Sequence, residues 1–177
     1  MRKLVYQVAC SLDGFIAGPN GEYDWIPEDP EVDFTKLVAR FDTLLMGRTT
    51  WETAAAQHDG APPFGLDTFI VSTTLDHAPH PKAQVISNDV EARVAQLKER
   101  PGKDIWLFGG SELFGHMLAA QLVDSVELAI VPIILGSGIP FAPPSEQRTP
   151  LELVSYRMYS RSGIALLRYS VIKSANR

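Results

Sequence analysis

The sequence predicts an α/β protein whose mixed, mostly parallel sheet carries helices on both faces and ends in an antiparallel hairpin. Short apolar runs rich in β-branched residues alternate along the chain with segments of helical periodicity, which favours parallel strands. The last two apolar runs are instead joined by the short turn 161–163, which favours a hairpin. A length of 177 residues is typical of one domain, so we expect a single domain spanning 1–177.

The first half of the chain reads as strand, loop and helix, followed by further strands. The apolar run Leu4–Cys10 predicts a buried strand, and the Gly-, Pro- and acid-rich segment 18–30 predicts a long loop. Apolar residues at 34, 37, 38 and 41 have the spacing of an amphipathic helix over Val32–Phe41. We then expect a strand over Asp42–Met46, a helix over Arg48–Ala56 and a strand over Thr68–Ser72.

The second half continues the alternation. After a brief strand over Gln84–Ser87, Asn88 and Glu91 have the spacing of a reciprocally capped helix start, and Pro101-Gly102 ends that helix. We expect a strand over Asp104–Phe108, a helix over Ser111–Gln121 and a strand over Val123–Val131. A glycine- and proline-rich loop from 132 to 150 leads into the hairpin strands Leu151–Ser160 and Ile164–Ile172.

Composition disfavours several classes of protein. The formal net charge of -5 argues against general binding to nucleic acid or to an anionic membrane. No stretch approaches the ~20 apolar residues of a membrane helix, and the first residues form no export signal. The single cysteine, Cys10, is expected to be a core residue. Only His77 and His80 are closely spaced and no third ligand is visible, so we expect no metal site. The lone cysteine and the lack of an export segment lead us to expect a cytoplasmic protein.

Two strand-to-helix junctions carry glycine, at Met46-Gly47-Arg48-Thr49 and at Phe108-Gly109-Gly110-Ser111. Each junction is suited to presenting backbone N–H groups at a positive helix end, as a phosphate requires. At one junction alone, glycine is more simply explained as a turn residue. Two junctions in one small domain favour a dinucleotide, and the planar guanidinium of Arg48 suits a ribose 2'-phosphate.

An acidic segment surrounds Trp25 and includes Asp29. It is either a solvated loop leading into a helix, or a functional loop in which Trp25 packs on a ring system and one carboxylate handles a proton. The residues alone do not choose between these two interpretations.

Taken in order, these segments resemble the dihydrofolate reductase fold family, most closely its branch related to the reductase domain of bacterial riboflavin biosynthesis deaminase-reductases. The resemblance covers nearly the whole chain. It rests on five segments, at 11–18, 21–26, 46–52, 69–73 and 108–114. In the family the glycine pair that matches Gly109-Gly110 binds pyrophosphate and contains a cis peptide.

The resemblance implies an NADPH-dependent reductase that transfers hydride to a C=O or C=N carbon of a small heterocyclic substrate related to pterins, pyrimidines or flavins. It also implies a set of residues that bind the cofactor or line its nicotinamide site. These are Ala9, Ile16, Trp25, Gly47, Arg48, Thr49, Ser72, Thr73, Gly109, Gly110, Ser111, Leu113 and Phe114. Asp29 and Trp25 are the expected catalytic pair, with Asp29 supplying or relaying the proton.

Two departures from the family bear on the substrate. Leu66 stands where dihydrofolate reductases place the arginine that pairs with the folate glutamate, and Gln7 stands where riboflavin reductases have a lysine. Dihydrofolate is therefore expected to be a poor substrate. The alternative to a reductase is a nucleotide-binding module of the same fold without turnover. Apart from the small-molecule substrate, the one partner we expect is a second copy of the chain, in a homodimer.

Overall fold

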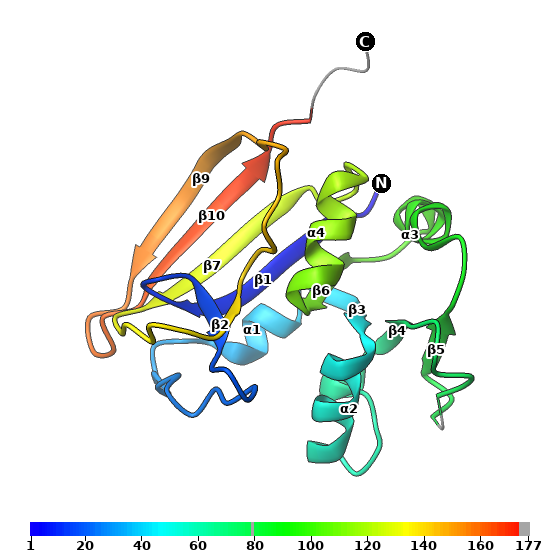
Figure 1. The fold of residues 1–177 in the computed structure, drawn as a ribbon, viewed down its shortest axis with the longest axis horizontal. Helices are drawn as coiled ribbons and strands as arrows, with labels where there is room; N and C mark the ends of the chain where they lie inside the picture. The colour runs from blue at the N-terminus through cyan, green and yellow to red at the C-terminus, as the bar shows by residue number, and fades with distance from the viewer. Residues whose placement is uncertain (79, 174–177) are drawn as a thin grey trace.

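One eight-stranded sheet forms the frame of the protein (Figure 1). The structure, a computed structural model, describes residues 1–78 and 80–173, so the last four residues of the expected domain lie outside the described part. The order of strands across the sheet is β5-β4-β3-β6-β1-β7-β10-β9. The strands are β1 (Leu4–Ser11), β2 (Phe15–Ala17), β3 (Phe41–Gly47), β4 (Asp67–Val71), β5 (Ala83–Ile86), β6 (Asp104–Gly109), β7 (Ser125–Val131), β8 (Ile139–Pro140), β9 (Leu151–Met158) and β10 (Ala165–Val171). The helices are α1 (Phe34–Val38), α2 (Arg48–Gln57), α3 (Val90–Glu99) and α4 (Ser111–Ala119), with a 3-10 turn at Pro63–Gly65.

The six strands from β5 to β7 run parallel, and β10 and β9 complete the sheet as an antiparallel pair. Parallel strands need covered faces, which explains their nearly continuous apolar sequences. This arrangement confirms the fold class that the alternation of segments predicts.

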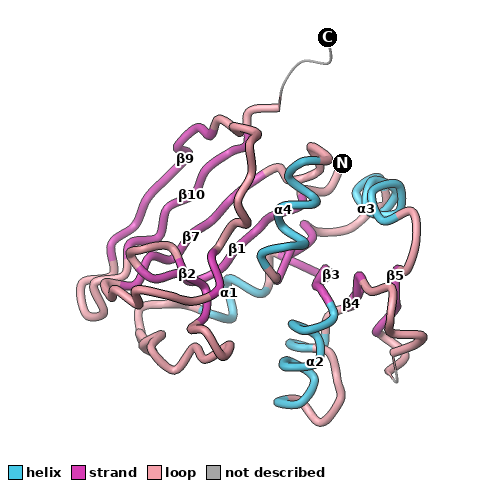
Figure 2. The backbone as a smooth tube through the Cα atoms, viewed as in Figure 1, coloured by secondary structure: helices cyan, strands magenta, loops and turns pink. Residues whose placement is uncertain are grey.

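Two apolar clusters lie on the two faces of the sheet, because successive strand residues point to opposite sides. On one face Leu45 and Leu107 pack with residues of α3 and α4, among them Val94 and Phe114. On the other face Leu44, Met46, Ile70 and Trp106 pack with Trp51 of α2 and with the partly buried Leu37 and Val38 of α1. In Figure 2 α4 crosses in front of the middle of the sheet.

Helix α1 is shorter than the sequence predicts. It begins after Asp33, whose side chain accepts a hydrogen bond from the N–H of Lys36, and ends at Val38. The prediction over Val32–Phe41 is wrong at its carboxyl end because Phe41 already belongs to β3. There Phe41 is buried and stacks on Trp106 with ring centroids 5.1 Å apart.

The expected capping of α3 is also wrong. Asp89, not Asn88, precedes the helix, and it makes no side-chain capping hydrogen bond. Glu91 is not part of a reciprocal cap because its carboxylate pairs with His116 of α4. The side chain that the spacing assigns to the helix start therefore joins two helices.

The long loop from 132 to 150 contains a short strand that periodicity does not detect. Strand β8 pairs with β2 in a separate two-stranded sheet. Gly138 makes the approach possible, because a Cβ there would lie 2.2 Å from the carbonyl oxygen of Ala17. Elements of two and three residues are too short to show a period.

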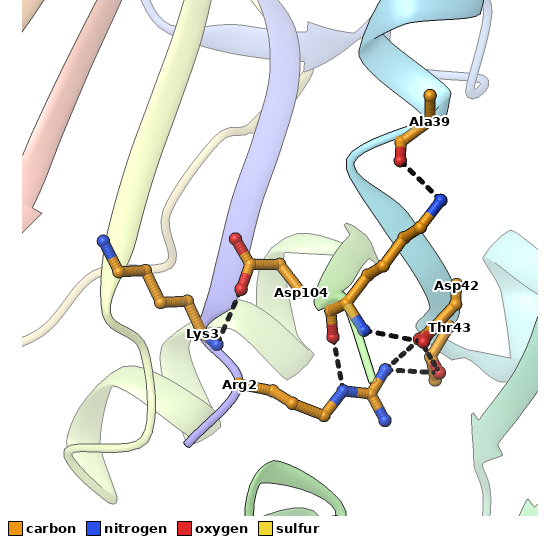
Figure 3. A network of polar contacts seen from close by, with 7 residues as sticks. Arg2, Lys3, Ala39, Asp42, Thr43 and Asp104 are labelled. Carbon is orange, nitrogen blue, oxygen red and sulfur yellow. Dashed lines mark hydrogen bonds and ion pairs between the residues drawn. The ribbon is translucent and has the colours of Figure 1, made fainter. Parts of the chain in front are cut away.

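A polar network ties the amino ends of β1, β3 and β6 together (Figure 3). The buried Arg2 guanidinium donates to Asp42, to the Thr43 hydroxyl at 2.7 Å and to the carbonyl of Lys103. The backbone N–H of Lys103 donates to the other Asp42 oxygen at 2.8 Å. These contacts stabilise the side of the sheet where the parallel strands begin. They take no part at the opposite side, where the parallel strands end.

Candidate functional site

The carboxyl ends of the parallel strands meet at one edge of the sheet, where ligands bind in open α/β folds. Helices α2 and α4 both begin at this edge, directly after β3 and β6, which are neighbours in the sheet. The two glycine junctions that the sequence singles out are therefore adjacent in space. The amino ends of two helices present backbone N–H groups and positive partial charge here.

The two junctions are in close contact. A Cβ on Gly47 would lie 3.9 Å from the backbone nitrogen of Gly110, and a Cβ on Gly110 would lie 3.5 Å from the Thr50 hydroxyl. Gly109 has φ +140°, a conformation that favours glycine, and the peptide bond between Gly109 and Gly110 is cis. The site thus keeps its backbone free of side chains where α2 and α4 begin.

Ser111, the first residue of α4, carries an unused polar group. The residue is 5% exposed, and its hydroxyl oxygen has no hydrogen-bond partner among the described residues. The next residues anchor the helix, because Leu113 and Phe114 are buried and the Phe114 ring stacks on Tyr6 at 3.9 Å. By packing in the core, the side chains of Leu113 and Phe114 hold the amino end of α4 in place.

Arg48 links the start of α2 to the end of β4. Its Nε donates to Glu52 at 2.9 Å and its Nη1 donates to the Thr74 hydroxyl at 2.7 Å. Ser72 is buried, and its hydroxyl accepts from the N–H groups of Thr74 and Leu75 at 3.2 and 3.0 Å. A guanidinium, hydroxyl groups and a helix amino end are thus together, with Arg48 still half exposed.

Thr49 and Thr73 are exposed at the same two element ends. Thr74 is not among the site residues expected from the sequence. The available signal was a hydroxyl side chain shortly after a predicted strand.

The residues expected around the nicotinamide lie at the carboxyl end of β1. Ala9 and Trp25 pack against the same apolar cluster, which is built from Val131, Tyr159, Ile164 and Leu166. The Trp25 indole N–H donates to the carbonyl of Glu22 at 3.2 Å. Ile16 is half-buried on β2, an element that contacts β1.

Asp29 is buried and both of its carboxylate oxygens accept hydrogen bonds. Oδ1 accepts from the N–H of Glu31 at 2.8 Å, and Oδ2 accepts from the N–H of Ser162 at 3.1 Å. Hydrogen bonds from Ser162 and from Glu31 lower the pKa of Asp29. The carboxylate therefore ties the acidic loop to the turn of the β9–β10 hairpin, and its part in proton transfer stays a prediction.

A charged cluster that sequence reasoning missed lies in the middle of the sheet. Glu127 of β7 is 3% exposed, and its carboxylate accepts two hydrogen bonds from Arg40, at 2.6 and 2.8 Å, and one from Arg168 at 3.1 Å. Gln7, directly opposite on β1, is also buried. The available signal was a charged or amide residue inside an otherwise apolar strand.

An open cavity of about 470 Å³ lies elsewhere, between α3 and strands β4 and β5. Its lining includes none of the residues expected to bind the cofactor. Polar groups suited to a phosphate converge instead at the carboxyl ends of β3, β4 and β6. The described residues include no group of three or more metal-ligating side chains. Among them, no helix combines the length and the apolar character that crossing a membrane requires.

Comparison with known proteins identifies the family. A family model described as RibD C-terminal domain matches residues 2–164. The chain belongs to the RibD C-terminal domain family. This result confirms the resemblance to the riboflavin-reductase branch.

One relative of this RibD C-terminal domain is Uncharacterized protein YyaP of Bacillus subtilis (strain 168). It is 33% identical over 179 residues, and the alignment covers 95% of this chain and 94% of YyaP.

Solved structures share the fold. A protein of Shewanella sp. PV-4 named for riboflavin biosynthesis has a TM-score of 0.83 and 24% identity, over 97% of this chain and 99% of that one. Dihydrofolate reductase from Enterococcus faecalis, complexed with NADP(H), has a TM-score of 0.70 and 18% identity, over 97% of both chains. Membership of the RibD C-terminal domain family indicates a general reductase function.

Proposed function

We propose that this RibD C-terminal domain is an NADPH-dependent reductase that transfers hydride to a C=O or C=N carbon of a small heterocyclic substrate. The substrate would be related to pterins, pyrimidines or flavins. The observation that carries the proposal is the pairing of two helix amino ends, at Gly47 and at Gly110, on adjacent parallel strands. NADPH has two groups of phosphate charge, its pyrophosphate and its ribose 2'-phosphate, and this edge offers a place for each.

Each phosphate would have its own set of partners. The pyrophosphate would bind at Gly109, Gly110 and Ser111, where the buried hydroxyl of Ser111 still lacks a partner among the described residues. The ribose 2'-phosphate would bind at Arg48, Thr49, Ser72 and Thr73, where the guanidinium is held by Glu52 and Thr74. A phosphate displacing Glu52 would exchange one charge-assisted hydrogen bond for another.

The nicotinamide, when bound, supplies the hydride. Ala9, Ile16 and Trp25 would hold its ring at the carboxyl end of β1, and their apolar surfaces would keep water from the reacting carbon. Asp29 would supply or relay the proton that accompanies hydride transfer. Its lowered pKa keeps the carboxylate ionised at neutral pH, which favours a relay through water over direct donation.

We also propose that residues 1–177 form one domain of a cytoplasmic protein that assembles as a homodimer. The support for the dimer is β9, an edge strand on which Leu151, Leu153, Val154, Tyr156 and Met158 are all exposed. Exposed apolar edge strands invite pairing with another chain, and twofold dimers are the commonest homo-oligomers.

The test is a binding titration followed by a turnover assay. NADPH is titrated into the protein, and its oxidation is then followed with oxidised pterins, oxopyrimidines and flavins. A reductase binds NADPH and oxidises it with at least one of these rings. Saturable binding without oxidation would identify a nucleotide-binding module, and absence of binding would contradict the proposal.

A further inference from the structure

Gln7, in the middle of β1, carries a buried oxygen without a hydrogen-bond partner among the described residues. The residue is 8% exposed, and its Oε1 is the unpaired atom. Buried polar side-chain atoms are nearly always paired in native proteins, so an unpaired one needs an explanation. Together with Ser111 Oγ it forms the whole set of such atoms in the part of the chain that the structure describes.

The neighbours of Gln7 are engaged with one another. Its backbone carbonyl accepts a hydrogen bond from the Trp106 indole N–H at 3.0 Å. Glu127, opposite in β7, uses its carboxylate for Arg40 and Arg168. A carboxylate has no proton to donate to Oε1, and Arg40 and Arg168 both donate to Glu127.

One aromatic ring, that of Trp106, contacts Gln7, and two further rings extend from Trp106 to the surface. Phe64 stacks on Trp106 with ring centroids 5.6 Å apart and an interplanar angle of 7°. Phe64 is 42% exposed, and Phe34, 6.4 Å from it, is 55% exposed. We call Phe34, Phe64 and Trp106 the aromatic shelf.

The backbone at Phe64 is unusual. Its φ of +57° is uncommon for a bulky residue, and such conformations occur preferentially at ligand sites. The exposed face of an aromatic ring is a surface on which a planar ligand stacks.

The shelf lies beside the nicotinamide site proposed above. Gln7 and Ala9 point to the same face of β1 because they are two residues apart, which places them about 7 Å from each other. A ring held at Gln7 would therefore lie next to a nicotinamide at Ala9. This step rests on the proposed function.

We propose that Gln7 determines substrate specificity by accepting a hydrogen bond from a ring N–H of a planar heterocycle held on the aromatic shelf. The last torsion of a glutamine side chain is broad, so the carboxamide turns toward a ligand without backbone movement. A carboxamide carries an acceptor and two donors. It is thus complementary to a cyclic amide, in which a ring N–H and a carbonyl are adjacent.

Two probe molecules and two variants test this proposal. Lumazine, which has ring N–H groups beside carbonyls, and 1,3-dimethyllumazine, which has none, are titrated into protein saturated with NADP⁺. We expect the wild type to bind lumazine about tenfold or more tightly than the dimethyl compound, the effect of one or two hydrogen bonds. Gln7→Leu should remove most of this preference. Gln84→Leu, on the edge strand β5, is the matched control and should keep it.

Stability and cofactor binding separate recognition from a structural role. Leucine at position 7 removes an unpaired buried oxygen, so Gln7→Leu should melt no lower than wild type and bind NADP⁺ unchanged. If Gln7→Leu does not fold, Gln7→Met replaces it in the same comparison.

The proposal is overturned if wild type shows no preference, if it binds neither lumazine, or if a folded Gln7 variant keeps the preference. Failure of NADP⁺ itself to bind would count against the proposed function instead, and it is measured first.

Discussion

Hydrogen bonds from two backbone N–H groups stabilise the ionised carboxylate of Asp29. The N–H groups of Glu31 and Ser162 hold the carboxylate, and hydrogen bonds from Ser162 and Glu31 lower its pKa. Because the folded-state pKa lies below the unfolded value of about 3.9, its contribution to stability is fully present above that pH. The contribution is lost as the pH falls through the folded-state pKa.

Asp29→Asn should therefore flatten the dependence of the free energy of unfolding on pH as the pH falls below about 5. Urea unfolding of both proteins across this range measures the difference. If Asp29 also relays the proton, the variant loses about 10²-fold or more in turnover while NADPH affinity changes little. Parallel stability curves would refute the tie, and unaltered turnover would remove Asp29 from the mechanism.

We expect Leu66 to make dihydrofolate a poor substrate. It is half-buried against the apolar cluster of Trp106 and Phe41, so it offers no charge to a glutamate carboxylate. The lost charge-assisted hydrogen bond corresponds to roughly 1.5 to 3 kcal/mol, about tenfold to more than a hundredfold in affinity. Steady-state kinetics with dihydrofolate measure this, and efficient turnover would contradict the assignment.

At the scale of elements, the amino ends of the parallel strands stabilise the fold, whereas their carboxyl ends form the proposed cofactor site. Asp42 joins the amino ends of β1, β3 and β6 by accepting from Arg2 and from the Lys103 N–H. Asp42→Ala leaves the buried Arg2 guanidinium without its charged partner and should cost about 1.5 to 3 kcal/mol of unfolding free energy. Chemical denaturation measures the loss. The exposed Asp67, at the start of β4, supplies the control Asp67→Ala.

NADPH affinity of folded Asp42→Ala should equal that of wild type, since the network lies at the edge opposite the proposed cofactor site. A tenfold loss of affinity would show that the two edges are coupled.

The order of elements is predictable because each is a local pattern. Gly47 and Gly109 follow apolar runs, so both junctions are visible in the sequence before their contact is known. Phe41 shows where such prediction fails. An apolar residue at this position fits both the spacing of a helix and a buried strand, and the structure places it in β3. Glu91 shows a second limit, because its partner His116 lies on another helix.

The charged cluster could not be derived from the sequence, since it depends on pairing between distant segments. Arg168 lies opposite Glu127 because β10 pairs with β7, and Arg40 reaches the same carboxylate from the segment between α1 and β3. A glutamate within an apolar strand signals burial with a partner but does not identify that partner. The carboxylates of the loop 22–33 present the same difficulty, because Asp29 and Glu31 find hydrogen-bond donors, Ser162 and Ser160, in the distant β9–β10 turn.

At the scale of the whole molecule, β9 is the surface to test for assembly. Tyr156 is 70% exposed, so Tyr156→Lys leaves the monomer's core intact while placing a charge on the proposed interface. We expect a dimeric wild type and a monomeric variant in size-exclusion chromatography with light scattering. Ile134→Lys, at a loop residue 65% exposed, is the control and should remain dimeric. A monomeric wild type at all concentrations would contradict the proposed homodimer.

An acidic molecule of net charge -5 must attract a phosphate locally, and Arg48 is the side chain placed to do so. The most direct measurement is the titration of NADPH and NADH into wild type, Arg48→Ala and the control Arg93→Ala, whose arginine is exposed on α3. With one or two charge-assisted hydrogen bonds to the 2'-phosphate, wild type and control should bind NADPH tens to thousands of times more tightly than NADH. Arg48→Ala should lose most of this preference while its NADH affinity changes little. Equal affinity of the wild type for the two cofactors, or a preference that survives in Arg48→Ala, would contradict the account.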